Sequence, residues 1–142
     1  MPTIVRFEDM EVWQTSRELT RLIYDITKNE MFSRDFGLSN QMRRASVSIM
    51  SNIAEGFESR TNLLFKDYLG RAKASAGELR AQVYVAKDIE YIGEDDFSQI
   101  LGLCVKCSRQ ISRFVKYLEQ QPNAIRDEGI EYNVLTCKHV NM

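Results

Sequence analysis

Apolar residues recur along the chain at the three- and four-residue steps of α-helices, in four separate segments. The segments cover residues 8–28, 39–57, 62–92 and 95–121, and turn-forming residues lie between them. Such spacing places apolar side chains on one face of a helix and leaves the other faces to charged side chains. The pattern therefore predicts four amphipathic helices joined by short connections.

The third and fourth segments carry unbroken heptad patterns, in which steps of four and three alternate. In the third segment the apolar positions are Phe65, Leu69, Ala72, Ala76, Leu79, Val83 and Ala86. In the fourth segment they are Phe97, Ile100, Cys104, Cys107, Ile111, Phe114 and Leu118. Heptad rows are typical of helices that pack side by side with a left-handed twist. The expected fold is an all-α, antiparallel up-down-up-down four-helix bundle.

The second segment has apolar residues on an unusually wide arc. One row consists of Leu38, Met42, Ala45, Ile49 and Ile53. The other row consists of Val47, Met50, Ala54 and Phe57. Together they span roughly 200° of the helix, whereas about 100° is enough for a surface helix. This width predicts either a central position in the fold or contact with a second subunit.

Residues with capping preferences indicate where the helices begin and end. Ser39 is expected at the N-cap of the second helix, and Gly56 directly after its last turn. Thr61 and Asp95 are expected to cap the third and fourth helices. Each of these side chains or backbones can satisfy polar groups that a helix end leaves unpaired.

The length and the composition indicate one globular domain. The chain has 142 residues, of which 44% are hydrophobic and 27% charged, enough for a core without disulfides or metal. The prolines, Pro2 and Pro122, lie outside all four segments, so no proline interrupts a predicted helix. We expect the bundle over residues 1–121 and a flexible tail over residues 122–142, in which residues 130–135 could form a short strand.

Charge and cysteine content restrict the class of protein further. The formal net charge of −1 argues against coating nucleic acid by bulk charge, but it is compatible with a local basic patch. No run approaches the ~18 apolar residues of a membrane span, and residues 1–11 lack the apolar stretch of a signal peptide. Three cysteines without a secretion signal predict reduced thiols and a cytoplasmic location.

Few side-chain groups suggest catalysis or metal binding. Cys104 and Cys107 have a C-x-x-C spacing, and with Cys137 and His139 they could provide four zinc ligands. Because both lie on an apolar row, core packing is the preferred interpretation. The chain has no Glu-x-x-His pair, no phosphate-binding glycine loop and no nucleophile elbow. We therefore expect no enzymatic activity, no cofactor and no metal.

Basic residues are more ordered than the net charge suggests. In the fourth segment a row opposite the apolar face consists of Lys106, Arg109, Arg113 and Lys116. In the third segment Lys66, Lys73, Arg80 and Lys87 recur every seven residues. Such rows are either solvated helix faces or surfaces that bind phosphates and release counterions. The third segment also carries Gly70 and Gly77, which suggest that another backbone approaches closely, within the subunit or between subunits.

Several short motifs stand out along the chain: Phe7-Glu-Asp-Met10, Phe36-Gly-Leu38, Arg43-Arg44-Ala45, Ser51-Asn-Ile-Ala-Glu-Gly56 and Ser75-Ala-Gly-Glu-Leu79. Together they resemble one bacterial family, the four-helix-bundle proteins encoded in intervening sequences of 23S rRNA genes. The chain also resembles the related accessory variability determinants of diversity-generating retroelements. The resemblance covers residues 7–120.

This resemblance implies a ring-like homopentamer without enzymatic activity, which binds RNA or DNA through basic surfaces. The candidate nucleic-acid-binding residues are Arg43, Arg44, Lys106, Arg109, Arg113 and Lys116. The motif residues Asn52, Glu55, Gly56 and Glu78 are assigned to folding or assembly, for instance by pairing Arg43 or Arg44 with a carboxylate. A protein–protein scaffold with no nucleic-acid role is the alternative. No membrane and no small-molecule substrate are expected as partners.

Overall fold

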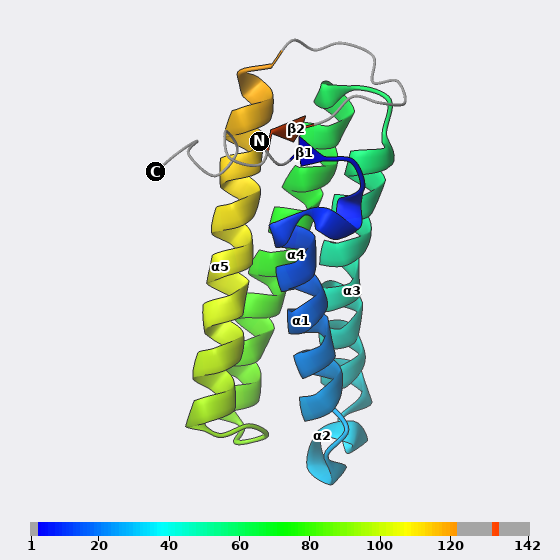
Figure 1. Ribbon diagram of the computed structural model, residues 1–142. Coiled ribbons are helices and arrows are strands. Elements are labelled where there is room, and N and C mark those ends of the chain that lie inside the picture. Colours follow the sequence, from blue (N-terminus) through cyan, green and yellow to red (C-terminus); the bar gives the residue numbers. More distant parts are fainter. Residues whose placement is uncertain (1–2, 122–131, 134–142) are drawn as a thin grey trace.

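Four long helices pack as an antiparallel bundle in the computed structural model, which describes residues 3–121 and 132–133. They are α1 (Glu11–Ile26), α3 (Phe36–Glu58), α4 (Asn62–Asp88) and α5 (Glu94–Glu119). Successive long helices run in opposite directions, and α1 closes the bundle against α5 (Figure 1). The predicted all-α helical bundle is confirmed.

The heptad rows of α4 and α5 form the centre of the core. All seven predicted positions of α4 are buried, and so are the positions of α5 from Ile100 to Leu118. Phe97 is half-buried at the edge of the core, where its ring packs edge-on against Tyr84 with 5.2 Å between the ring centroids. Alternating steps of three and four keep the apolar side chains on the face that meets the neighbouring helices.

Helix α3 is not central, so one of the two explanations for its wide apolar arc is wrong. It lies between α1 and α4 and buries the row from Met42 to Ile53 against them. In the second row Phe57 is buried, Met50 and Ala54 are half-buried, and Val47 is 40% exposed. Contact of this second row with another subunit stays a prediction.

A short helix that the sequence did not indicate, α2 (Glu30–Arg34), lies between α1 and α3. The side chain of Asn29 caps it by accepting a hydrogen bond of 2.7 Å from the backbone N–H of Phe32. The ring of Phe32 is fully buried, with its centroid 5.1 Å from that of Tyr91. Asn, Ser, Asp and Gly at positions 29–37 are typical of turns, which is why this stretch was predicted as a connection.

Three of the four predicted caps were wrong. Helix α3 begins earlier than expected, because the side chain of Asp35 accepts from the backbone N–H of Leu38 at 3.1 Å, and Ser39 is buried inside the helix. Helix α5 has Gly93 at its N-cap, and Asp95 lies in its first turn. The cap of Thr61 on α4 is confirmed by a hydrogen bond of 3.1 Å from the N–H of Leu64.

Gly56 does not end α3, because the helix continues to Glu58 and the glycine is buried within it. A Cβ atom at position 56 would lie 2.8 Å from Cδ1 of Phe65 and 2.9 Å from Cβ of Tyr68. Carbon atoms in proteins pack at about 3.5–4.0 Å. The glycine is therefore required for the close approach of α3 and α4, and not as a helix terminator.

Helix α4 ends four residues earlier than predicted. Glu90 has a φ of 62°, which is the left-handed conformation that stops a helix. The backbone N–H of Tyr91 donates a hydrogen bond of 2.9 Å to the carbonyl of Ala86. This is the usual C-terminal motif with a glutamate in the place that glycine prefers. This ending could not be predicted from the residue type, because Glu is a good helix former.

The first residues of the described chain pack against the bundle, where Ile4 and Met10 are buried. The 3-10 helix η1 (Phe7–Asp9) precedes α1, and strand β1 (Thr3–Ile4) pairs antiparallel with β2 (Tyr132–Asn133). Strand β2 agrees with one expectation for the tail. The remaining residues of the predicted tail, with Cys137 and His139, lie outside the described residues.

Candidate nucleic-acid interface

The two cysteines of the C-x-x-C pair are packed in the core, as predicted. Both side chains are buried on α5, and burial raises the pKa of each thiol from 9.0 to about 12. Because the thiolate is the reactive form, neither thiol is prepared for redox chemistry or metal binding.

We expect Cys104 and Cys107 to resist alkylation by iodoacetamide in the folded protein and to react once it unfolds in urea. A Cys137→Ser variant removes the third thiol, so that mass spectrometry counts only the buried pair. Rapid double modification of this variant without denaturant would contradict the buried positions.

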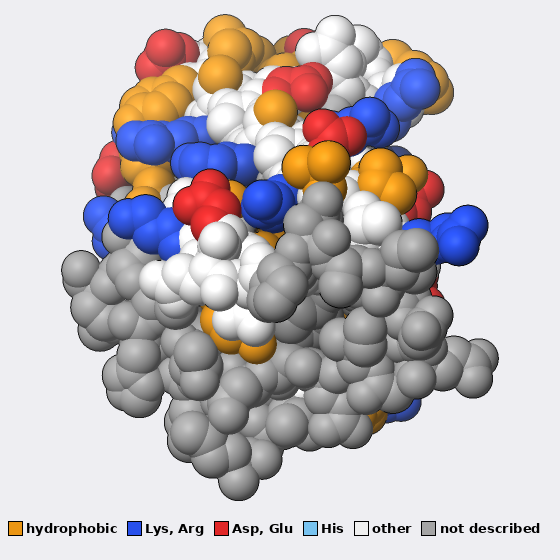
Figure 2. Space-filling model, turned by 90° about the horizontal axis from the view of Figure 1, so that it is seen from above, with side chains coloured by type: hydrophobic (Ala, Val, Ile, Leu, Met, Phe, Trp, Pro, Cys, Tyr) orange, Lys and Arg blue, Asp and Glu red, His pale blue; other side chains and the backbone are white. Residues whose placement is uncertain are grey.

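The basic row of α5 lies on the side facing away from the core and borders α4. Lys106, Arg109 and Lys116 are exposed, and Arg113 is half-buried. On this side α4 contributes Lys73, whose Nζ donates to Oγ of Ser108 at 2.9 Å. Figure 2 shows Lys and Arg side chains gathered on the left, the side on which α5 lies in Figure 1.

Two adjoining hollows run along this side, and Arg109 and Arg113 line both. We call them together the α4–α5 groove; its polar lining consists of Lys73, Ser98, Lys106, Ser108, Arg109, Ser112 and Arg113. No carboxylate lines either hollow among the described residues. The groove therefore combines cations with hydroxyl groups, the two kinds of donor that bind phosphate oxygens in proteins.

Among the described residues, the cations of the groove have no acidic partners. The ion pairs within residues 3–121 and 132–133 engage other basic residues, namely Arg6, Lys28, Arg34, Arg71 and Lys87. Lys73, Lys106, Arg109 and Arg113 take part in none of them. Their positive charge is therefore available to a ligand, and a nearly neutral chain still presents a local cationic surface.

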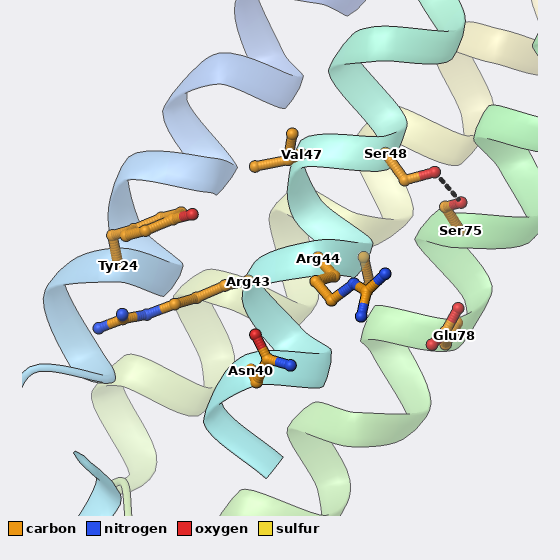
Figure 3. A pocket seen from close by; sticks show the side chains of 9 residues that line it. Tyr24, Asn40, Arg43, Arg44, Val47, Ser48, Ser75 and Glu78 are labelled. Atoms are coloured by element: carbon orange, nitrogen blue, oxygen red, sulfur yellow. Dashed lines mark hydrogen bonds between the residues drawn. The ribbon is translucent and has the colours of Figure 1, made fainter. Parts of the chain in front are cut away.

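Arg43 belongs to the fold. Its Nε donates to Oγ1 of Thr27 at 2.8 Å, and its guanidinium lies over the ring of Tyr24, 4.7 Å from the centroid. Tyr24 lies in the last turn of α1, and Thr27 directly follows this helix. Arg43 therefore joins α3 to α1. In Figure 3 its side chain extends away from Arg44 and toward α1.

Arg44 lies in a second, separate groove, which Arg43 and Tyr24 of α1 also line. Arg44 on α3 and Glu78 on α4 line the facing sides of this groove (Figure 3). Between the helices, the hydroxyls of Ser48 and Ser75 are hydrogen-bonded at 2.9 Å. Within α3 the amide of Asn52 donates to the carbonyl of Ser48 at 2.8 Å and to its hydroxyl at 3.0 Å.

The profile of the family described as 23S rRNA-intervening sequence protein matches residues 8–113. The chain belongs to this family. Among curated proteins there is no match.

A solved structure supports the fold of this 23S rRNA-intervening sequence protein. It is a protein with unknown function from the S23 ribosomal protein family of Bacteroides thetaiotaomicron, which superposes with a TM-score of 0.68 at 24% sequence identity. The match covers 74% of this chain and 98% of that one. At this identity the likeness concerns the bundle alone. The relation to accessory variability determinants stays a prediction.

The family motif residues of the 23S rRNA-intervening sequence protein lie where α3 meets its neighbours. Asn52 and Gly56 contribute to the α3–α4 contact through Ser48 and through the missing Cβ. Glu78 accepts from Nε2 of Gln82 at 3.1 Å, while Glu55 is exposed on α3. The described residues contain no ion pair of Arg43 or Arg44 with either carboxylate, so the suggested pairing is wrong within one subunit.

The structure does not bring the two predicted groups of cations together. Arg43 and Arg44 lie on α3, whereas the row from Lys106 to Lys116 lies on α5, and α3 and α5 occupy diagonal corners of the bundle (Figure 1). Instead, Lys73 of α4 joins the α5 row. The heptad recurrence of lysines on α4 was the available signal, but it did not show which lysine joins the basic row of α5.

No helix within the described ranges of this 23S rRNA-intervening sequence protein has an apolar stretch sufficient to cross a membrane.

Proposed function

We propose that this protein is a non-enzymatic, homo-oligomeric bundle that binds RNA through the α4–α5 groove. The observation that carries the proposal is a groove with four cations, Lys73, Lys106, Arg109 and Arg113, which have no acidic partner within the described part of the chain. The association of the family with 23S rRNA intervening sequences makes RNA the first ligand to test. Reduced thiols in the core agree with action in the bacterial cytoplasm.

A filter-binding titration of the purified protein with fragments of 23S rRNA tests this proposal. We expect the logarithm of affinity to fall linearly with the logarithm of salt, with a slope of about −0.7 to −0.9 for each phosphate contact. Four cations in the groove thus give a slope near −3. Absence of binding at low salt would contradict RNA binding through this surface.

Self-association is proposed through the outer side of α4. Gly70 and Gly77 lie in the helix interior, where glycine costs about 1 kcal/mol relative to alanine. A Cβ atom at either position would meet nothing within 4 Å, so packing inside the subunit does not require them. Tyr84 and Val85, on the same side, are 45% and 47% exposed. A second copy approaching this side would use both the glycines and the apolar side chains.

Light scattering tests the assembly. A homopentamer is expected to have five times the protomer mass of 16.5 kDa. A Gly77→Leu variant adds bulk on the outer side of α4 and should lower the observed mass, while Met31→Ala on α2 should leave it unchanged. A wild-type protein with the mass of one protomer would contradict the oligomer.

The alternative is a scaffold that binds a protein and no nucleic acid. The exposed Tyr84, Val85 and Val47 favour it, because protein interfaces are enriched in apolar and aromatic side chains. Purification from its own host separates the two functions. Co-purifying RNA supports the first, whereas a stoichiometric protein partner without RNA supports the second.

A further inference from the structure

The α4–α5 groove offers charges and hydroxyls but no aromatic surface. None of the residues that line it is aromatic. The nearest rings of α5 are already occupied: Phe114 and Tyr117 are buried, and Phe97 is covered by Tyr84 and by Nζ of Lys87, 4.7 Å from its centroid. Proteins that bind single-stranded nucleic acid stack its bases on exposed rings, and sequence-specific RNA readers do the same. This groove lacks that means of recognition.

The cations have the spacing of a regular strand. Lys106 and Arg113 are seven residues apart on one helix, which corresponds to about 10.5 Å along its axis. Each strand of double-helical DNA places one phosphate per ~3.4 Å of axis, so a regular strand offers more than one phosphate over a distance of this size. Lys73 lies beside the same stretch, and its bond to Ser108 orients the ammonium group. Rigid helices carrying fixed charges match a rigid strand better than a flexible one, because less ordering is required on binding.

The α4–α5 hairpin changes charge toward its turn. Lys87, near the end of α4, is paired with Glu94 at 2.6 Å. Around this turn the side chains of Asp88, Glu90, Asp95 and Asp96 are all exposed. A phosphate backbone extended toward the turn would meet this negative charge and be repelled. The favourable contact is therefore confined to the part of the groove around Lys73 and from Lys106 to Arg113.

We infer that the α4–α5 groove holds the phosphate backbone of one strand of double-helical RNA, without contacts to the bases, and that this contact ends before the α4–α5 turn. The inference rests on the proposed RNA binding and specifies the form of the RNA. Ser108 and Ser112 supply hydroxyl donors for phosphate oxygens, and Lys73, Lys106, Arg109 and Arg113 supply the charge. Recognition of this kind depends on the shape of the duplex and not on its sequence.

Competition binding with the full-length oligomer tests the inference. The probes are two short RNA duplexes of unrelated sequence and the separate strands of each. We expect both duplexes to bind equally, and about tenfold more tightly than their strands, because only the duplex presents phosphates in the fixed spacing of the groove. Strands that bind as tightly as duplexes, or one duplex strongly preferred over the other, would overturn the inference and leave RNA binding intact. Failure of every RNA to bind would instead overturn the proposed function.

Two matched lysine variants on α4 locate the contact. Lys73→Gln removes a charge of the groove and should weaken duplex binding severalfold and reduce the salt slope by about one. Lys87→Gln removes a charge of the same type on the same helix, but one that is paired with Glu94, and should leave both quantities unchanged. Circular dichroism and light scattering verify that each variant remains folded and assembled. Equal losses in the two variants would overturn the proposed boundary of the contact.

Discussion

Gly56→Ala is expected to lower the free energy of unfolding by about 2–3 kcal/mol, although it adds only a methyl group. The new Cβ atom would lie 2.8 Å from the ring of Phe65 and 2.9 Å from Cβ of Tyr68. Phe65 is fully buried and its ring packs against Phe57 and Phe114, so it cannot move aside without disturbing the centre of the core. Helices α3 and α4 would have to separate, and urea denaturation would show the loss.

Gly102→Ala is the matched control for this variant. Gly102 is also inside a long helix, but a Cβ atom there meets nothing within 4 Å. Replacement by alanine should therefore stabilise α5 by up to ~1 kcal/mol, through higher helix propensity alone. Combining Gly56→Ala with Phe65→Leu should recover part of the lost stability, because the smaller side chain leaves space for the methyl group. A Gly56→Ala protein as stable as wild type would contradict the close approach of α3 and α4.

Phe32→Ala is expected to cost about 3–5 kcal/mol of unfolding free energy, a large effect for a helix of five residues. The ring of Phe32 is fully buried at the lower end of the bundle and packs on Tyr91. Tyr91 in turn donates from its hydroxyl to Oδ2 of Asp35 at 3.1 Å, so the same cluster holds the N-cap of α3. Loss of the ring therefore leaves a cavity and loosens α2 together with the start of α3.

The neighbouring residue provides the comparison for Phe32. Met31 lies on the same short helix but is 59% exposed, and Met31→Ala should change the stability by less than ~0.5 kcal/mol. Thermal unfolding followed by circular dichroism at one protein concentration compares the two variants. Similar midpoints for both would mean that α2 is not held by its aromatic side chain.

The long helices and their buried faces were predictable because the heptad rows of α4 and α5 are regular over many turns. The ends of the helices were less predictable, since several residues near each end can cap it. Ser39 and Asp35 are both good N-cap residues, and only the position of Phe32 and Tyr91 favours Asp35. Gly56 illustrates a deeper limit. A glycine near a helix end looks like a terminator, whereas its actual role depends on a side chain of the next helix.

Part of the candidate site could likewise be predicted from the sequence, and part could not. The cationic row of α5 was visible in the sequence, because Lys106, Arg109 and Arg113 recur on one face. The partnership with Lys73 was not, because it depends on how α4 is shifted along α5. For the same reason the sequence could not distinguish Lys73 from Lys87, which has the same heptad position but is paired with Glu94 across the turn.

The contact between α1 and α5 makes closure of the bundle a late event in protein synthesis. Helices α3 and α4 are consecutive and can form a hairpin once residue 88 has left the ribosome, but α1 must wait for α5. At a synthesis rate of about 5–20 residues per second, the time between completion of α1 and completion of α5 is roughly 5–20 s. During this time the part of α1 that packs on α5 in the finished protein lacks its partner. A chaperone that assists this chain would therefore be expected to bind α1 during synthesis.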